Sequence, residues 1–176
     1  MVKILCVLLL SSSAFAQVPK TSWTLESSIL TYNVHFVLKS FKGISRGAKG
    51  KGECKSGTCE FIIGVPLKDF DTGDTNRDFH MLEVMKAAQN PMVLVKVTFS
   101  EKIKLAAFQA DVEIDVAGSK KTYSKLPLTA DVKKDGMVAV KGKIPLVLSD
   151  IKVEEPWLLT VKIDEAVPVD FEMIWK

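Results

Sequence analysis

The chain has 176 residues, of which 47% are hydrophobic and 26% are charged, with a formal net charge of +3. This length and apolar content suit one globular domain with a sizeable core. The near balance of basic and acidic side chains gives no long-range field for a polyanion, which excludes nucleic-acid binding as the main function.

The first 16 residues have the pattern of a cleaved signal peptide. Lys3 supplies a positive start, Ile4 to Leu10 form an apolar run, and Ala14-Phe15-Ala16 is a small-x-small cleavage site. The apolar run is shorter than the roughly 20 residues that span a bilayer, and no second run approaches that length. We therefore expect residues 17–176 to form an exported domain, periplasmic or secreted, without a transmembrane segment.

Two of the three cysteines lie outside the expected signal peptide, at Cys54 and Cys59. The four residues between them include Gly57 and are typical of a hairpin turn. An oxidising compartment favours a disulfide across such a turn. Free thiols, a redox pair and half of a zinc site are the alternatives.

The first clear strand runs from Leu30 to Leu38, where apolar residues alternate with mostly polar ones. The segment Lys39 to Gly52 follows, rich in glycine and basic residues. Its glycines predict a strongly bent strand or a loop near the rim of a barrel. Beyond the two cysteines, Phe61 to Val65 read as the next strand, which ends at Pro66.

A helical pattern interrupts the strands between Asp71 and Phe99. Apolar residues at positions 81, 84, 85 and 88 have the i, i+3, i+4, i+7 spacing of one helix face, which is typical of core packing. We predict a helix from about Arg77 to Ala88, ended by Pro91. Polar residues before it, including Asp74, can cap its first turn.

The rest of the chain alternates at a period of two. The predicted inward faces comprise residues 93–99, 108–116, 126–132, 138–148 and 167–175, every second residue in each case. Gly118 and the Asp135-Gly136 pair mark turns between them. Leu158 to Ile163 is a further candidate strand.

Seven to nine strands joined mostly by short turns, with one short helix between strands, predict a mainly β, antiparallel protein. Its apolar faces can turn inward as a two-sheet sandwich or as a closed barrel. A barrel of about eight strands is either filled by its own side chains or wide enough for one slender ligand. The pattern of residues leaves these outcomes open.

No catalytic motif stands out, so we expect no enzyme activity. The acidic loop contains Asp69, Asp71, Asp74 and Asp78, but it lacks the glycine and glutamate of an EF-hand loop. We interpret these aspartates mainly as residues that cap the helix and form turns, with calcium binding as the alternative. We interpret His35 and His80 as structural histidines.

Six basic side chains gather within a short segment and suggest either a solvated face or a cationic mouth. A cationic mouth could meet an anionic head group or make transient contact with a membrane surface. The six residues are Lys39, Lys42, Arg46, Lys49, Lys51 and Lys55.

Several motifs spread over Trp23 to Trp175 resemble the YceI-like family. The most specific is Thr72-x4-Arg77-Asp78-x-His80, followed by Pro91 and a Val-x-Phe strand. The supporting motifs are Trp23-Thr-Leu25, Ser28-x3-Tyr32-x-Val34-His35-Phe36, Asn90-Pro91, Val97-Thr98-Phe99 and the run from Val112 to Thr122 through Gly118-Ser-Lys120.

The resemblance implies an exported, eight-stranded, lipocalin-like barrel that holds an isoprenoid or related lipid, such as a quinone, and needs no other cofactor. A filled barrel that acts as a stress-associated protein-interaction module is the alternative, and the oligomeric state stays open. The expected ligand-binding side chains lie on the apolar face of each strand. They are Tyr32, Val34, Phe36, Val95, Val97, Phe99, Val112, Ile114, Val138, Val140, Val169 and Phe171.

Overall fold

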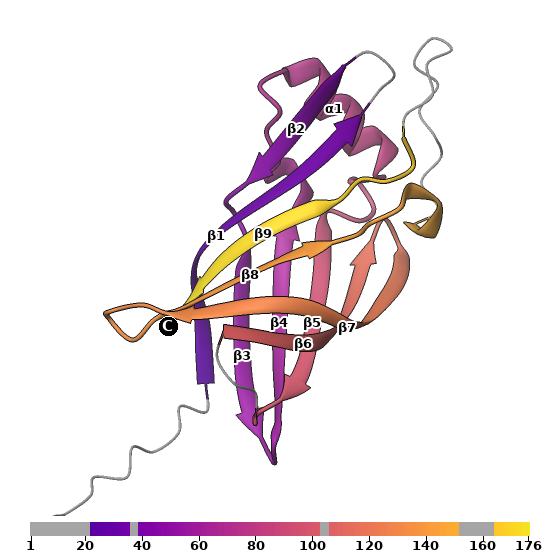
Figure 1. Cartoon of the computed structure of the whole chain (residues 1–176). Coiled ribbons are helices and arrows are strands. Elements are labelled where there is room, and N and C mark those ends of the chain that lie inside the picture. Colours follow the sequence, from indigo (N-terminus) through magenta and orange to yellow (C-terminus); the bar gives the residue numbers. More distant parts are fainter. Residues whose placement is uncertain (1–21, 36–38, 103–105, 152–163) are drawn as a thin grey trace, which may run out of the picture.

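The computed structural model describes residues 22–35, 39–102, 106–151 and 164–176. In these residues the chain forms nine strands, one α-helix and two short 3-10 helices (Figure 1). The strands are β1 (Ser22–His35), β2 (Ser40–Ser45), β3 (Lys49–Lys55), β4 (Thr58–Pro66), β5 (Met92–Ser100), β6 (Ala106–Val116), β7 (Ser119–Val132), β8 (Val138–Ile144) and β9 (Val169–Trp175). The helical elements are η1 (Leu67–Asp69), α1 (Thr75–Val84) and η2 (Leu148–Ile151).

The sheet closes on itself as an antiparallel barrel. Its order is β1-β3-β4-β5-β6-β7-β8-β9, and β9 pairs back onto β1 between Leu25 and Tyr32. β3 pairs with the first residues of β1, and β2 pairs with the last residues along the same edge. The described residues thus form a closed eight-stranded barrel extended by β2, which confirms the predicted fold. In the part of the chain that the structure describes, closure leaves β2 as the terminal strand, and its outer edge carries the isolated bridge between Ile44 and Asp71.

The glycine-rich segment Lys39 to Gly52 contains both β2 and β3. Residues 46–48 separate the two strands, which both run antiparallel to β1 and pair with successive parts of the same edge. β2 lies beside α1 at one end of the barrel (Figure 1). The segment thus forms two strands with a short break between them, where the sequence predicted a strongly bent strand or a loop.

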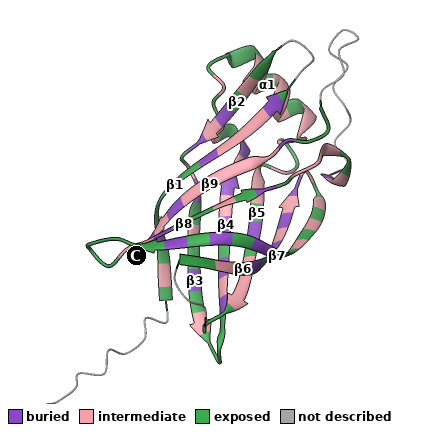
Figure 2. Ribbon diagram, viewed as in Figure 1, coloured by how far each residue is buried: buried purple, intermediate pink, exposed green. Residues whose placement is uncertain are grey.

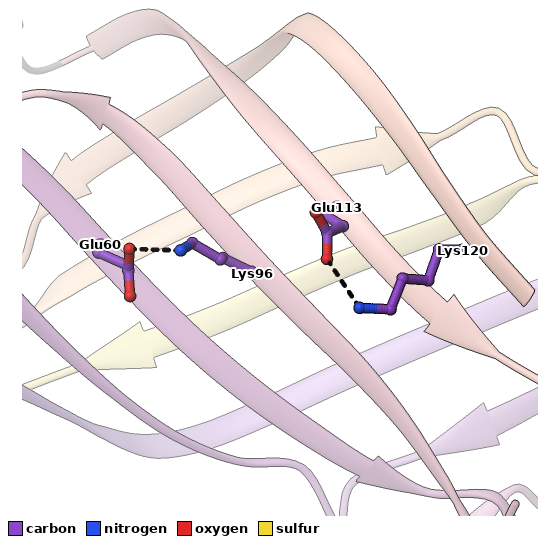
Figure 3. A network of polar contacts seen from close by, with 4 residues as sticks. All are labelled: Glu60, Lys96, Glu113 and Lys120. Atoms are coloured by element: carbon purple, nitrogen blue, oxygen red, sulfur yellow. Dashed lines mark ion pairs between the residues drawn. The ribbon is translucent and has the colours of Figure 1, made fainter. Parts of the chain in front are cut away.

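Burial alternates along the strands as the sequence predicts (Figure 2). On β6, every second side chain from Ala110 to Val116 is buried. The opposite faces carry ion pairs, with Glu60 Oε2 lying 2.7 Å from Lys96 Nζ and Glu113 Oε1 lying 3.5 Å from Lys120 Nζ (Figure 3). Such exposed pairs stabilise little individually, so their main effect is to keep the outer face hydrated.

The helix α1 begins earlier and ends earlier than the predicted Arg77 to Ala88. It begins at Thr75 because the Asp74 carboxylate accepts hydrogen bonds from the backbone N–H groups of residues 76 and 77. It ends at Val84 because Lys86 adopts a left-handed conformation with a φ of 51°. Backbone bonds from Lys86 N–H to the carbonyl of residue 83 and from residue 87 to residue 82 close a Schellman motif.

The predicted strand from Val138 to Leu148 is also too long. β8 ends at Ile144, and the following Pro145 lacks the N–H group that a ladder needs. Leu148 begins η2 instead. The candidate strand Leu158 to Ile163 lies outside the described residues.

Cys54 and Cys59 form a disulfide at the tip of the β3–β4 hairpin. The two residues face each other in the register, and their Cα atoms are 4.0 Å apart. Ser56 and Gly57 form the turn with φ values of 54° and 84°, the positive φ pair that a tight hairpin requires. The hairpin lies at the end of the barrel opposite α1 (Figure 1).

Aromatic rings fill the half of the barrel nearest this hairpin. We call Phe61, Phe99, Phe108 and Trp175 the aromatic plug. The Phe61 ring centroid lies 5.6 Å from that of Phe99 and 4.8 Å from that of Trp175, and the Phe99 and Phe108 centroids are 5.1 Å apart. These separations are typical of attractive aromatic pairs, so this half of the interior is closed by its own side chains.

Candidate functional site

The other half of the interior contains a cavity of about 540 Å³. This volume lies within the range of small-molecule binding pockets. The strand ends nearest α1 form the wall of the cavity. The wall residues are Leu30, Tyr32, Val34, Phe41, Val65, Val93, Val95, Ile114, Val116, Ile144 and Val169. The helix and the loops contribute the cover, which consists of Leu67, Phe70, Asp74, Asn76, Arg77, His80, Met81, Val84, Met85, Leu146, Leu148, Ile151 and Val167.

The cavity is apolar over most of its wall and polar in one place. Nineteen of its 24 lining residues are apolar. Four of the five polar ones belong to the seven-residue stretch from Asp74 to His80, and the fifth is Tyr32. Such a wall suits a ligand with a long apolar part and a small polar end.

Five of the twelve predicted ligand-binding residues line this cavity: Tyr32, Val34, Val95, Ile114 and Val169. They come from β1, β5, β6 and β9, and the closed barrel brings them together at one end. Their role in binding stays a prediction.

The other predicted residues lie elsewhere or outside the described chain. Five of them belong to or pack against the buried core without lining the cavity, namely Val97, Phe99, Val112, Val140 and Phe171. Val138 is half-buried at the start of β8, opposite Trp175. Phe36 is not among the described residues.

The residues that the sequence reasoning missed come mainly from the helix and the loops. Met81, Val84 and Met85 form the apolar helix face that the sequence already revealed, but that face covers a cavity rather than completing a filled core. α1 contains no fully buried residue, which fits a cover better than a core helix. The position of the helix between two barrel strands was the signal available in the sequence.

The acidic loop serves the start of α1. Asp74 caps the helix, and Asp78 Oδ1 accepts hydrogen bonds from Thr72 Oγ1 at 2.6 Å and from the Thr72 N–H at 3.1 Å. Arg77 donates from Nε to Thr72 Oγ1 at 2.9 Å. In the described residues, no group of three or more His, Cys, Asp or Glu side chains is arranged to hold a metal ion.

Tyr32 is held among rings at the polar end of the cavity. Its centroid lies 6.4 Å from that of Phe41 and 5.4 Å from that of Phe70. Burial, and then the negative charge of Asp78, raise the pKa of Tyr32 to about 12, although the Arg77 guanidinium acts in the opposite direction. The hydroxyl is therefore protonated at neutral pH.

The two histidines differ in their surroundings. His35 is exposed at the end of β1, whereas His80 lines the cavity and places Nδ1 3.6 Å from Glu83 Oε2. The six basic residues between positions 39 and 55 are all exposed. Contact between these residues and a membrane surface stays a proposal. Among the described residues, no helix is both long enough and apolar enough to cross a membrane.

Comparison with known sequences yields one family match. The model of a family described as "YceI-like domain" matches residues 23–174. No curated protein sequence matches the chain.

Two solved structures show the same architecture at low sequence identity. One is a polyisoprenoid binding domain from Saccharophagus degradans implicated in plant cell wall breakdown, with a TM-score of 0.71, 16% identity, and coverage of 89% of this chain and 99% of that domain. The other is BcnA from Burkholderia cenocepacia, with a TM-score of 0.69, 13% identity, and coverage of 84% of this chain and 95% of BcnA. At these identities the likeness shows a shared fold.

Proposed function

The chain belongs to the YceI-like family, and from that premise we propose that it binds an apolar chain ligand, an isoprenoid or a related lipid, in the cavity beneath α1. The observation that carries the proposal is the apolar cavity of about 540 Å³ in a barrel whose other half is closed by aromatic rings. The polyisoprenoid binding domain from Saccharophagus degradans, which shares the fold, supports an isoprenoid as the ligand class.

The binding would be driven by removal of apolar ligand surface from water. Each Å² transferred contributes about 25 cal/mol, before the cost of ordering the ligand is subtracted. The aromatic plug sets how deep the chain can enter, because Phe61 and Trp175 occupy the space beyond. The chain would therefore enter from the α1 end and stop at the plug.

The alternative of a filled barrel that acts through protein contacts describes the plugged half only. The cavity argues against it, because a barrel that serves only as a scaffold has no need of an apolar space. The lining also suggests ligand binding rather than catalysis. Among the described lining residues, the polar groups cap the helix or lie singly, and they do not pair a nucleophile with a general base.

Export is part of the proposal and depends on residues 1–16, which lie outside the described chain. If the signal peptide directs secretion, the disulfide between Cys54 and Cys59 would form in the same compartment. A lipid carrier in that compartment would shield its cargo from water.

The test is identification of a co-purified ligand. The protein is purified from its native host without detergent, an organic extract is analysed by mass spectrometry, and the stripped protein is titrated with a polyprenyl lipid. We expect about one isoprenoid per protein and saturable rebinding. A clean extract together with no uptake of added lipid would overturn the proposal.

A further inference from the structure

Two large apolar side chains lie close together on the outer face of the barrel. Ile62 on β4 is 55% exposed, and Leu94 on β5 is 50% exposed. They are diagonal neighbours in the β4–β5 ladder, where the partner of Leu94 is Gly64, two residues beyond Ile62. Gly64 has no side chain to cover the backbone between them. Apolar side chains that gather on an exposed face commonly mark a contact surface.

Charged side chains flank this apolar centre, with basic residues on one side and acidic residues on the other. The register of β3, β4, β5 and β6 aligns two rows of residues, and these rows face outward because the residues between them, such as Ile63 and Val95, are buried. The rows are Lys49–Gly64–Leu94–Asp115 and Lys51–Ile62–Lys96–Glu113. We call these eight residues the outer patch. Its β3 end is basic, and its β6 end is acidic.

Some charges of the outer patch have no ion-pair partner within the described part of the chain. They are those of Lys49, Lys51 and Asp115. Glu113 Oε1 lies 3.5 Å from Lys120 Nζ on the next strand (Figure 3), and an exposed pair of this kind is weak enough to rearrange. Each end of the outer patch thus holds charge that a partner surface can neutralise.

The order of these charges makes the outer patch complementary to itself. Consider a two-fold axis in the plane of contact that runs between β4 and β5, parallel to the strands. Rotation about it places β3 of one copy against β6 of the other, and β4 against β5. Lys49 then faces the partner's Asp115, and Lys51 faces the partner's Glu113. Each contact occurs twice, as in any isologous interface.

The same charges disfavour other arrangements and another kind of partner. A two-fold axis that crosses the strands would place β3 against the partner's β3, and lysine against lysine. An anionic lipid surface would be attracted by the lysines of β3 but repelled by the carboxylates of β6 on the same face. The pattern therefore favours a second copy of this chain over a membrane.

We propose that the outer patch is the contact surface of a homodimer, with ion pairs between β3 and the partner's β6 and an apolar centre at Ile62 and Leu94. In this dimer each Leu94 lies opposite the partner's Gly64, where the ladder carries no side chain. The inference goes beyond the proposed function and does not depend on it, because the outer patch and the cavity lie on opposite faces of the strands. An axis parallel to the strands also places both α1 ends at the same end of the dimer (Figure 1).

The first test is the mass of the purified protein in solution, measured by sedimentation equilibrium over a range of concentrations. We expect a reversible dimer whose dissociation constant rises with salt, because salt screens the ion pairs between β3 and β6. A monomer at every concentration up to about 1 mM would overturn the proposal.

An apolar variant tests whether the dimer uses this face. Leu94→Gln should raise the dissociation constant at least about tenfold, because it places a polar side chain at the centre of the contact. Ile29→Gln is the matched control, since Ile29 is an exposed apolar residue on β1, outside the outer patch. Circular dichroism checks that both variants fold. A dimer that Leu94→Gln leaves unchanged, or that both variants weaken equally, would overturn the proposal.

Charge reversal tests the direction of the axis. Lys49→Glu and Asp115→Lys should each weaken the dimer, and the double variant should regain most of the lost affinity. The two residues lie three strands apart in the register, about 14 Å at the usual strand spacing, so the regained affinity cannot come from a contact within one chain. Additive losses in the double variant would overturn the proposed pairing of β3 with β6.

Vesicles distinguish a second copy from a lipid surface. Wild type and Leu94→Gln are sedimented with vesicles of phosphatidylglycerol and phosphatidylethanolamine. We expect the two proteins to bind these vesicles to the same extent, because the outer patch serves the dimer. Vesicle binding by the wild type that Leu94→Gln abolishes would assign the outer patch to a membrane and overturn the dimer. Neither result bears on lipid binding in the cavity, which the co-purified ligand tests separately.

Discussion

Single residues decide where the interior is open and where it is closed. Gly43 admits the Tyr32 ring into the space beside the cavity, because a Cβ at Gly43 would lie 2.3 Å from Tyr32 Cε1. Gly52 does the same for Phe61 in the aromatic plug, with a distance of 2.3 Å to Phe61 Cδ1. These glycines are needed for close approach, since real Cβ contacts of this length do not occur.

The titration of Tyr32 tests its described environment. The chain has two tyrosines, so a Tyr123→Phe variant leaves Tyr32 as the single tyrosine. We predict that its phenolate absorbance rises near pH 12, because burial raises the pKa from the ordinary value of 10.0 to about 12. A midpoint near pH 10 would contradict the burial of this hydroxyl.

The same shift predicts a loss of stability in alkali. The folded state holds the Tyr32 proton more tightly than the unfolded chain does, so its contribution is full below pH 10 and is lost as the pH rises towards about 12. The free energy of unfolding of the Tyr32→Phe variant should therefore fall less steeply with pH across this window. Denaturant titrations at several pH values measure the difference, and identical slopes would contradict it.

Gly52, which lies against the aromatic plug, can be compared with a glycine whose nearest neighbour is the flexible end of a side chain. We predict that Gly52→Ala lowers the free energy of unfolding by about 1–3 kcal/mol, because the new methyl group must displace the Phe61 ring. Gly64→Ala is the control, since its nearest neighbour is the flexible end of Met92 at 3.0 Å. Chemical denaturation compares the two, and equal losses would count against the plug.

Among the elements, α1 contributes the most residues to the cover of the cavity. It is held by a capped start, a Schellman end and a half-buried apolar face, without a fully buried residue. Elements with few buried contacts open at lower free energy than the barrel strands around them. The helix is therefore the element through which a ligand would enter.

The cap provides a test of this role. We predict that Asp74→Ala destabilises α1 by about 1 kcal/mol, because two backbone N–H groups lose their acceptor. Amide hydrogen exchange should then accelerate in α1 while the barrel strands change little. Asp74→Asn keeps a capping oxygen and should behave like the wild type. Uniform acceleration over the barrel would show that α1 does not open separately.

Alternation along the chain predicted the strands and their inward faces because a strand buries every second side chain. The element ends were harder to predict. The left-handed residue that ends α1 is Lys86, and no glycine marks the position. Beyond Ile144, Leu146 and Leu148 still face the interior although the ladder has ended, so the apolar pattern outlasts the strand.

At the scale of the whole molecule, the barrel is half filled and half hollow. Alternation tells which face of a strand is inward, but it does not tell how far along the barrel axis a residue lies. Val95 and Val97 share a face of β5, yet one lines the cavity and the other packs against the core beyond it. The depth depends on strand register and tilt, which come from pairings between distant segments. For this reason the sequence predicted the barrel better than the cavity.

Neighbouring residues on β6 give the most direct test of the cavity as the binding site. Ile114 lines the cavity, whereas Val112, two residues earlier on the same face, is buried in the core without lining it. Ile114→Trp should fill the open space, and Val112→Trp should overpack a filled one at a cost of about 1–3 kcal/mol. The decisive measurement is titration of each stripped variant with a polyprenyl lipid, alongside its free energy of unfolding. We predict that Ile114→Trp stays folded and loses binding, whereas Val112→Trp loses stability and, where it folds, still binds. Wild-type affinity in a folded Ile114→Trp variant would contradict this prediction.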